Sequence, residues 1–152
     1  MAELALTRNL AGLRDALIVL AKAELEELGD FDPRAMVKTA DGKVTLIESL
    51  GSIADDVPKG LRAKQLRRYI EDSIRKMRET CEITSVAILS DGILRPQEGG
   101  PGRTAMLGFF EERPGPLLLV ITHYEIRDGH VHLGDVTITE REGHLVSPGP
   151  PV

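Results

Sequence analysis

The stretch "LLLVITHYEIRDGHVHLGDVTIT", residues 117–139, decides the fold class. Apolar and polar residues alternate on both sides of Asp128-Gly129, a pair that favours a two-residue β-turn because both residues tolerate positive φ. The pattern predicts strands over 117–126 and 130–139, joined as an antiparallel hairpin. This hairpin is the last part of a predicted β-meander.

Three further segments carry β signals. Residues 83–89 and 103–112 are rich in β-favouring side chains. The first segment predicts a strand that ends at the turn "SDG", and the second predicts the first strand of the meander. Residues 35–50 predict a hairpin around Asp41-Gly42, a turn that demands positive φ at both central positions. Together these segments predict an antiparallel sheet of five to six strands.

Two helices are expected in the first half of the chain. Residues 2–28 contain no Pro, and Gly29 is a stop signal; residues 61–80 predict a second, amphipathic helix. The fold class is therefore α+β, a single antiparallel sheet covered by a long N-terminal helix and a second helix. This element order resembles that of roadblock, profilin and PAS-like domains, which implies one sheet covered by helices. We expect one domain over 1–146 and an extended Pro-rich tail over 147–152.

The composition narrows the class of function. The chain has 152 residues, a net charge of −5, 3% aromatic residues and one cysteine, Cys81. A single cysteine excludes an intrachain disulfide and a cysteine-based zinc cluster. Few aromatic side chains leave few platforms for stacking bases, so nucleic acid is an unfavoured partner. The apolar runs are too short to cross a bilayer, and we expect a soluble, cytoplasmic protein without a membrane segment.

The N-terminal helix carries two apolar stripes. The first has the spacing of a heptad seam and consists of Leu6, Leu10, Leu13, Leu17 and Leu20. The second repeats every seven residues and consists of Leu4, Ala11, Ile18 and Leu25. Two stripes favour two neighbours, so one stripe is expected on the protein's own core and the other on a second copy or another protein. We assign the partner interface to the first stripe, the heptad seam. The alternative is a single wide face packed within one monomer.

The hairpin around Asp128-Gly129 gathers histidines on one face. Strand alternation places four candidate metal ligands together, namely His123, Glu125, His130 and His132. An H-x-H strand with a third His and a Glu across the ladder resembles the ligand set of cupin-type metal proteins, although the later acids do not fall at cupin spacing. A transition metal is therefore the alternative cofactor. The simpler interpretation is that the histidines lie on the solvent-exposed face of the sheet. The opposite, buried face would then hold Tyr124, Ile126, Val131 and Leu133. The apolar parity changes at Gly134, which predicts a β-bulge there.

The second helix carries a basic flank. Residues 59–78 contain eight basic and two acidic residues, a net charge of +6, so the rest of the chain carries −11. The basic face consists of Lys64, Arg67, Arg68, Arg75 and Arg78. It could bind phosphate or nucleic acid, or it could be neutralised internally, because Glu71 and Asp72 lie at helix spacing from basic residues.

These features favour a non-catalytic protein-interaction or regulatory module that self-associates through the N-terminal helix. No serine elbow and no Cys–His pair point to nucleophilic catalysis. One alternative is a metal-binding protein or metal-dependent enzyme that uses the histidine hairpin. Another is a small-molecule sensor with a ligand between sheet and helix.

Overall fold

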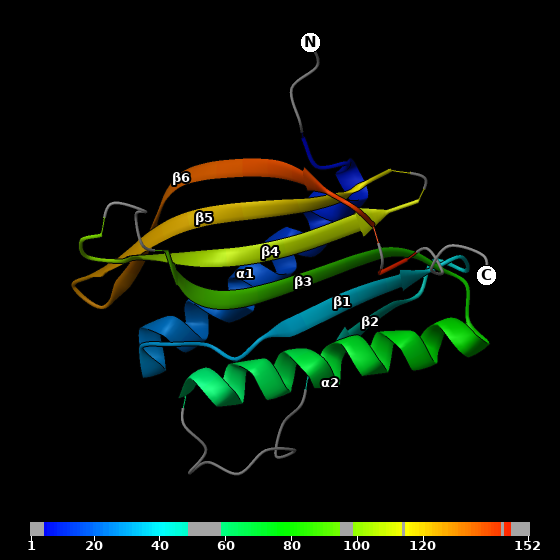
Figure 1. The fold of residues 1–152 in the computed structure, drawn as a ribbon, viewed down its shortest axis with the longest axis horizontal. Coiled ribbons are helices and arrows are strands. Elements are labelled where there is room, and N and C mark those ends of the chain that lie inside the picture. The colour runs from blue at the N-terminus through cyan, green and yellow to red at the C-terminus, as the bar shows by residue number, and fades with distance from the viewer. Residues whose placement is uncertain (1–4, 49–58, 95–98, 114, 144, 147–152) are drawn as a thin grey trace.

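The computed structural model describes residues 5–48, 59–94, 99–113, 115–143 and 145–146, except for the side chains of 59, 60, 62 and 63. It contains two helices and six strands: α1 (Arg8–Leu28), β1 (Arg34–Thr39), β2 (Val44–Ile47), α2 (Lys59–Thr80), β3 (Ile83–Leu94), β4 (Arg103–Glu112), β5 (Leu117–Arg127) and β6 (His130–Arg141). All strands form one antiparallel sheet in the order β2-β1-β3-β4-β5-β6 (Figure 1). The α+β class with six strands is therefore confirmed.

Both ends of α1 follow from side-chain and backbone chemistry. Thr7 caps the N-terminus, because its Oγ1 accepts a hydrogen bond from the Leu10 amide at 3.2 Å. Gly29 ends the helix in the left-handed conformation, with φ of 85°, and its amide donates to the Leu25 carbonyl at 2.9 Å. The predicted stop is confirmed, and the cap starts the helix later than predicted.

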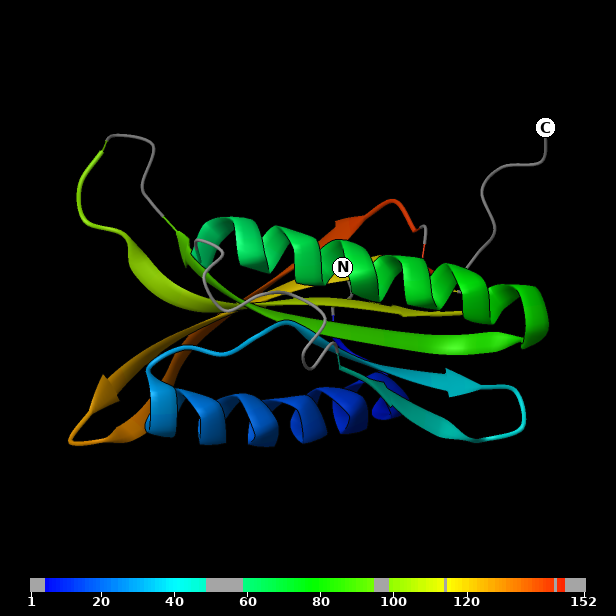
Figure 2. The ribbon, with the colours of Figure 1, turned by 90° about the horizontal axis from the view of Figure 1, so that it is seen from below.

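The helices cover opposite faces of the sheet, with α1 on one side and α2 on the other (Figure 2). The core beneath α1 combines Leu10, Leu17 and Leu25 with Met106 and Phe110 of β4. The core beneath α2 combines a separate set of side chains: Ala35, Val37, Ile70, Ile74, Ile83, Val86 and Ile88. The central strand β3 is therefore buried on both faces from residue 85 to residue 90.

On its own face, α2 lies mainly over β1 and β3, and no described helix covers β4, β5 and β6 there (Figure 1). Four half-buried apolar side chains line this part of the face: Leu107, Phe109, Leu119 and Ile121. At one end, Leu145 and Val146 return to the sheet, where Glu111 accepts their amide hydrogen bonds at 3.0 Å each. The predicted tail, residues 147–152, lies outside the described residues.

The two predicted turns have different outcomes. Asp128 and Gly129 have φ of 53° and 77°, as a two-residue hairpin turn requires. At the other turn only Gly42 has positive φ, 88°, so the prediction of positive φ at Asp41 was wrong. The Gly42 amide instead donates to the Thr39 carbonyl, and the Asp41 carboxylate accepts the Lys43 amide at 3.2 Å. The Thr39 hydroxyl also donates to this carboxylate, and this bond, followed by that from the Lys43 amide, holds the pKa of Asp41 below its ordinary value.

The predicted end of the strand over residues 83–89 was wrong. Strand β3 does not turn at Ser90-Asp91-Gly92 but runs on to Leu94, paired with β4 along its whole length. Gly92 serves packing here, because a Cβ at this position would lie 3.0 Å from Cδ1 of Leu107. Cys81 is exposed just beyond α2.

We expect Leu17→Ala to lower the free energy of unfolding by about 3 kcal/mol, because it leaves a cavity between α1 and the sheet. Urea denaturation measures the change. The matched control is Val19→Ala on the same helix, where the side chain is 67% exposed and the expected change is within about 0.5 kcal/mol. Equal losses in the two variants would contradict the assignment of this stripe to the core.

Candidate functional site

The histidine hairpin has the predicted pairing near its turn. Arg127 pairs with His130 and Glu125 with His132, and the register shifts between Thr122 and Tyr124. One residue of β5 lies opposite Gly134 and Asp135 of β6 at that shift, which is the predicted bulge. Beyond the turn, the predicted buried face is only half right. Tyr124 and Val131 are buried, whereas Ile126 and Leu133 are exposed.

Three of the four candidate metal ligands share one surface pocket. His123, Glu125 and His132 line a pocket of about 410 Å³. The fourth, His130, lies instead near Glu26 of α1, with 3.8 Å between Nδ1 and the carboxylate. Glu125 is engaged by Arg127 at 3.4 Å, which places a cation in the same pocket. Among the described residues no group of three or more His, Cys, Asp and Glu side chains is arranged to hold a metal ion.

The seam of the N-terminal helix faces the protein's own sheet. Leu10, Leu13 and Leu17 are buried in the core beneath α1, and Leu6 packs against that core. Ile18 and Leu25 of the second stripe lie in the same core, so both stripes form one wide face. The structure thus has the alternative arrangement, a single wide apolar face packed within one monomer. Leu10, Leu13 and Leu17 are therefore not accessible to a partner. Self-association remains a prediction that needs another surface.

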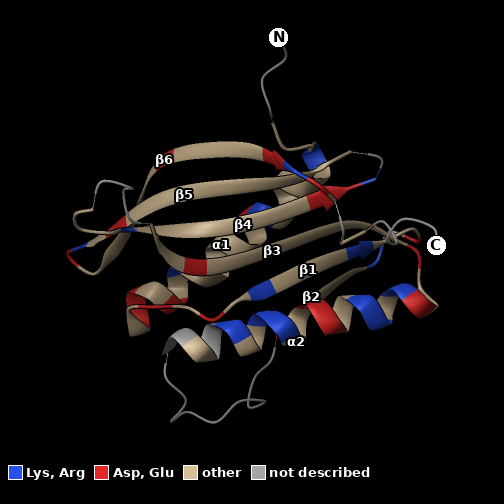
Figure 3. Ribbon diagram, in the orientation of Figure 1, with Lys and Arg blue, Asp and Glu red and all other residues tan. Residues whose placement is uncertain are grey.

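The basic face of α2 is divided rather than continuous (Figure 3). The Arg75 guanidinium pairs with Asp72 at 3.1 Å, and Arg78 lies with it near the C-terminal end of the helix. Toward the N-terminal end, Lys64 and Arg68 are exposed, while Arg67 extends over the ring of Phe109 at 3.9 Å. Burial lowers the pKa of the Arg67 guanidinium, and Glu71 acts in the opposite direction.

Strand β6 forms one edge of the sheet and exposes apolar side chains. It pairs with β5 on one side only and has 12 residues, whereas the opposite edge strand β2 has four. Leu133 and Val136 lie on the face that α1 packs against, but they are 43% and 51% exposed. This edge could not be predicted, because the alternation of residues within a single strand does not encode the order of strands in the sheet.

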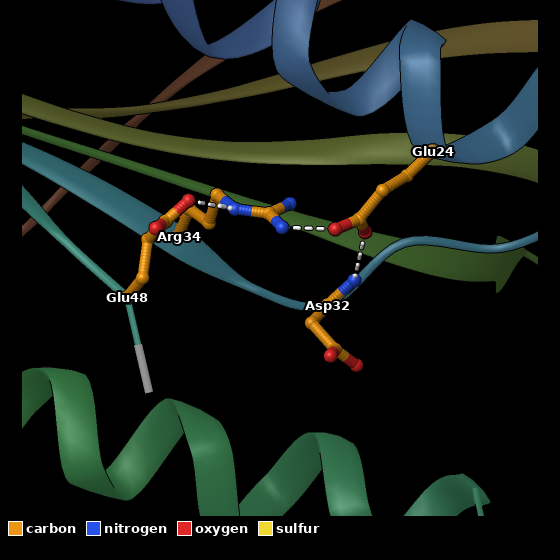
Figure 4. A network of polar contacts seen from close by, with 4 residues as sticks. All are labelled: Glu24, Asp32, Arg34 and Glu48. Atoms are coloured by element: carbon orange, nitrogen blue, oxygen red, sulfur yellow. Dashed lines mark hydrogen bonds and ion pairs between the residues drawn. The ribbon is translucent and has the colours of Figure 1, made fainter. Parts of the chain in front are cut away.

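A charged network joins α1 to the first hairpin (Figure 4). Arg34 of β1 bonds to Glu24 of α1, and its Nε donates to Glu48 at 2.7 Å. The other carboxylate oxygen of Glu24 accepts the Asp32 amide at 3.0 Å. The bond to Glu24 raises the pKa of Arg34 above its ordinary value, so the guanidinium stays charged, and its contribution to stability is lost only in strong alkali. This network is a structural clamp.

Comparisons with protein-family models, with curated proteins and with solved structures found no match for this chain. None of the helices in the described part of the chain is both long and apolar enough to span a membrane. What each candidate surface can bind therefore has to be inferred from its own charge, burial and hydrogen bonds.

Replacing Arg34 with Met should lower the free energy of unfolding by about 3 kcal/mol at neutral pH, because two partly buried carboxylates lose their cation. Urea unfolding at neutral pH tests this. Arg68→Met, which removes an exposed arginine, is the control, with an expected change within about 0.5 kcal/mol. A loss no larger than that of the control would contradict the clamp.

Proposed function

We propose that this protein is an interaction module that self-associates by pairing its β6 edge with β6 of a second copy. The observation that carries the proposal is the 12-residue edge of β6 with two half-exposed apolar side chains. At the turn end of this edge the Val131 amide donates to the Glu26 carboxylate at 2.8 Å, so the part available for pairing lies beyond Val131. The proposal keeps the self-association expected from the sequence and moves it from α1 to the sheet edge.

An open edge strand offers a row of backbone donors and acceptors that another strand can bind. Proteins that avoid such pairing shorten the edge or place charges along it. The edge strand β2 is short, but β6 is not, and Asp135 is the only charged residue between Val131 and Thr139 if histidine is neutral. The edge of β6 is therefore suited to strand addition.

A second copy is the simplest occupant, because a two-fold axis beside β6 brings the same strand against itself. Antiparallel strands satisfy this symmetry and extend the sheet across both copies. Val136 and Leu133 of each copy then gain neighbours on the face that α1 packs against. On the opposite face, the half-buried side chains of β4 and β5 become part of a wider continuous surface. Such a surface is suited to a regulatory assembly, which is the function we favour over catalysis.

Light scattering coupled to gel filtration tests the proposal. The wild-type chain should elute with about twice its mass of 16.6 kDa at high concentration. Val136→Lys should shift the population to monomer, because two-fold pairing brings the two lysines close to each other at the seam. The side chain is 51% exposed, so the monomer should remain folded.

The matched control is Val19→Lys, which adds the same charge at an exposed apolar site on α1. It should leave the dimer intact. A wild-type chain that stays monomeric at high concentration would contradict self-association. Dissociation by Val19→Lys but not by Val136→Lys would place the interface on α1 instead of the edge.

A further inference from the structure

A second surface, separate from the β6 edge, lies between the N-terminal half of α2 and the middle of the sheet. It is a pocket of about 410 Å³. The lining residues are Pro33, Lys64, Arg67, Arg68, Glu71 and Ser90. Three cationic side chains and one carboxylate therefore meet in a pocket of the size that small ligands occupy.

The positive charge of this pocket is only partly neutralised. Its single carboxylate, Glu71, accepts a hydrogen bond from Nε of Arg67 at 3.2 Å. Within the described part of the chain, neither Lys64 nor Arg68 forms an ion pair. The lining carries a net charge of +2 at neutral pH, which suits a dianion. In Figure 3 the blue segments toward the N-terminal end of α2 belong to this part of the helix.

Two contacts fix the Arg67 guanidinium in position, and its two terminal nitrogens have no hydrogen-bond acceptor among the described residues. Its Nε is bound to Glu71, and its guanidinium stacks on the ring of Phe109 at 3.9 Å. The two terminal nitrogens donate to no described residue. A guanidinium that is fixed in position with two free donors can bind an oxyanion in the bidentate geometry that arginine favours.

Ser90 supplies an independent observation. Its residue is 9% exposed, and its hydroxyl oxygen is buried without a hydrogen-bond partner among the described residues. A buried polar group without a partner is costly and indicates a missing water, ion or ligand. Because Ser90 lines the pocket, rotation about χ1 can aim its hydroxyl at an oxygen bound there.

We infer that this pocket binds the dianionic phosphate group of a small phosphate monoester, with Arg67, Arg68 and Lys64 as cationic contacts and Ser90 as a hydroxyl donor. A dianion matches the net charge of the lining. A phosphodiester, with one negative charge, matches it less well.

The test is a titration with inorganic phosphate at pH about 8, where phosphate is largely dianionic, at constant ionic strength and followed by amide NMR. The wild-type spectrum should show saturable shifts centred on Ser90 and Arg67. Arg68→Gln should weaken phosphate binding about tenfold, and Ser90→Ala about fivefold. Dimethyl phosphate, a monoanionic diester, should bind more weakly than phosphate.

Arg75→Gln is the matched control, because it removes the same charge from the same helix outside this pocket. It should change the affinity by less than about twofold, since only screened long-range attraction is lost. Shifts that do not saturate, or equal losses in Arg68→Gln and Arg75→Gln, would overturn the site. Tight binding of an oligonucleotide without a terminal phosphate, weakened equally by both variants, would make α2 a nucleic-acid surface instead. The NMR spectrum of each variant reports whether it is folded.

Discussion

Two helices cannot cover both faces of a six-stranded sheet, and this constraint governs the rest of the structure. A helix with its side chains is about 10 Å wide, and strands lie about 4.8 Å apart, so one helix covers roughly two strands. The helices α1 and α2 lie on opposite faces, and the strand between them, β3, is buried on both. Strands farther from this centre are covered less, and β6 is the longest strand left at an edge.

The exposed apolar side chains and the cationic pocket lie at the borders of the areas that the two helices cover. Apolar side chains emerge on β6 beyond α1, and others on β4 and β5 beyond α2. The side of α2 that faces this open area places Arg67 on Phe109 and creates the cationic pocket above Ser90. Where the covering is complete, polar groups serve the fold instead, as Arg34 does between Glu24 and Glu48. The positions of the two helices therefore decide which parts of the sheet belong to the core and which remain as candidate interaction surfaces.

Local signals in the sequence predicted the elements well, and tertiary arrangement explains the errors. Gly29, Asp128-Gly129 and the parity change at Gly134 each fix the backbone locally, and all three were confirmed. The alternation also predicted the α+β class. It could not say that both stripes of α1 share one core, because helix spacing does not show how wide a surface the sheet offers. Ser90-Asp91-Gly92 resembles a turn, yet pairing with β4 extends the strand through it. Edge position and the pocket at Ser90 depend on strand order, which no local pattern contains.

The most direct test of the proposed self-association is amide hydrogen exchange along β6 as a function of protein concentration. Apart from the Val131 amide, which donates to Glu26, the backbone amides of β6 that do not bond to β5 face the open edge and exchange through solvent contact. If β6 pairs with β6 of a second copy, these amides should become protected as concentration rises, while the amides of β2 at the opposite edge should not change. Exchange of the β6 amides that is independent of concentration would contradict pairing at this edge.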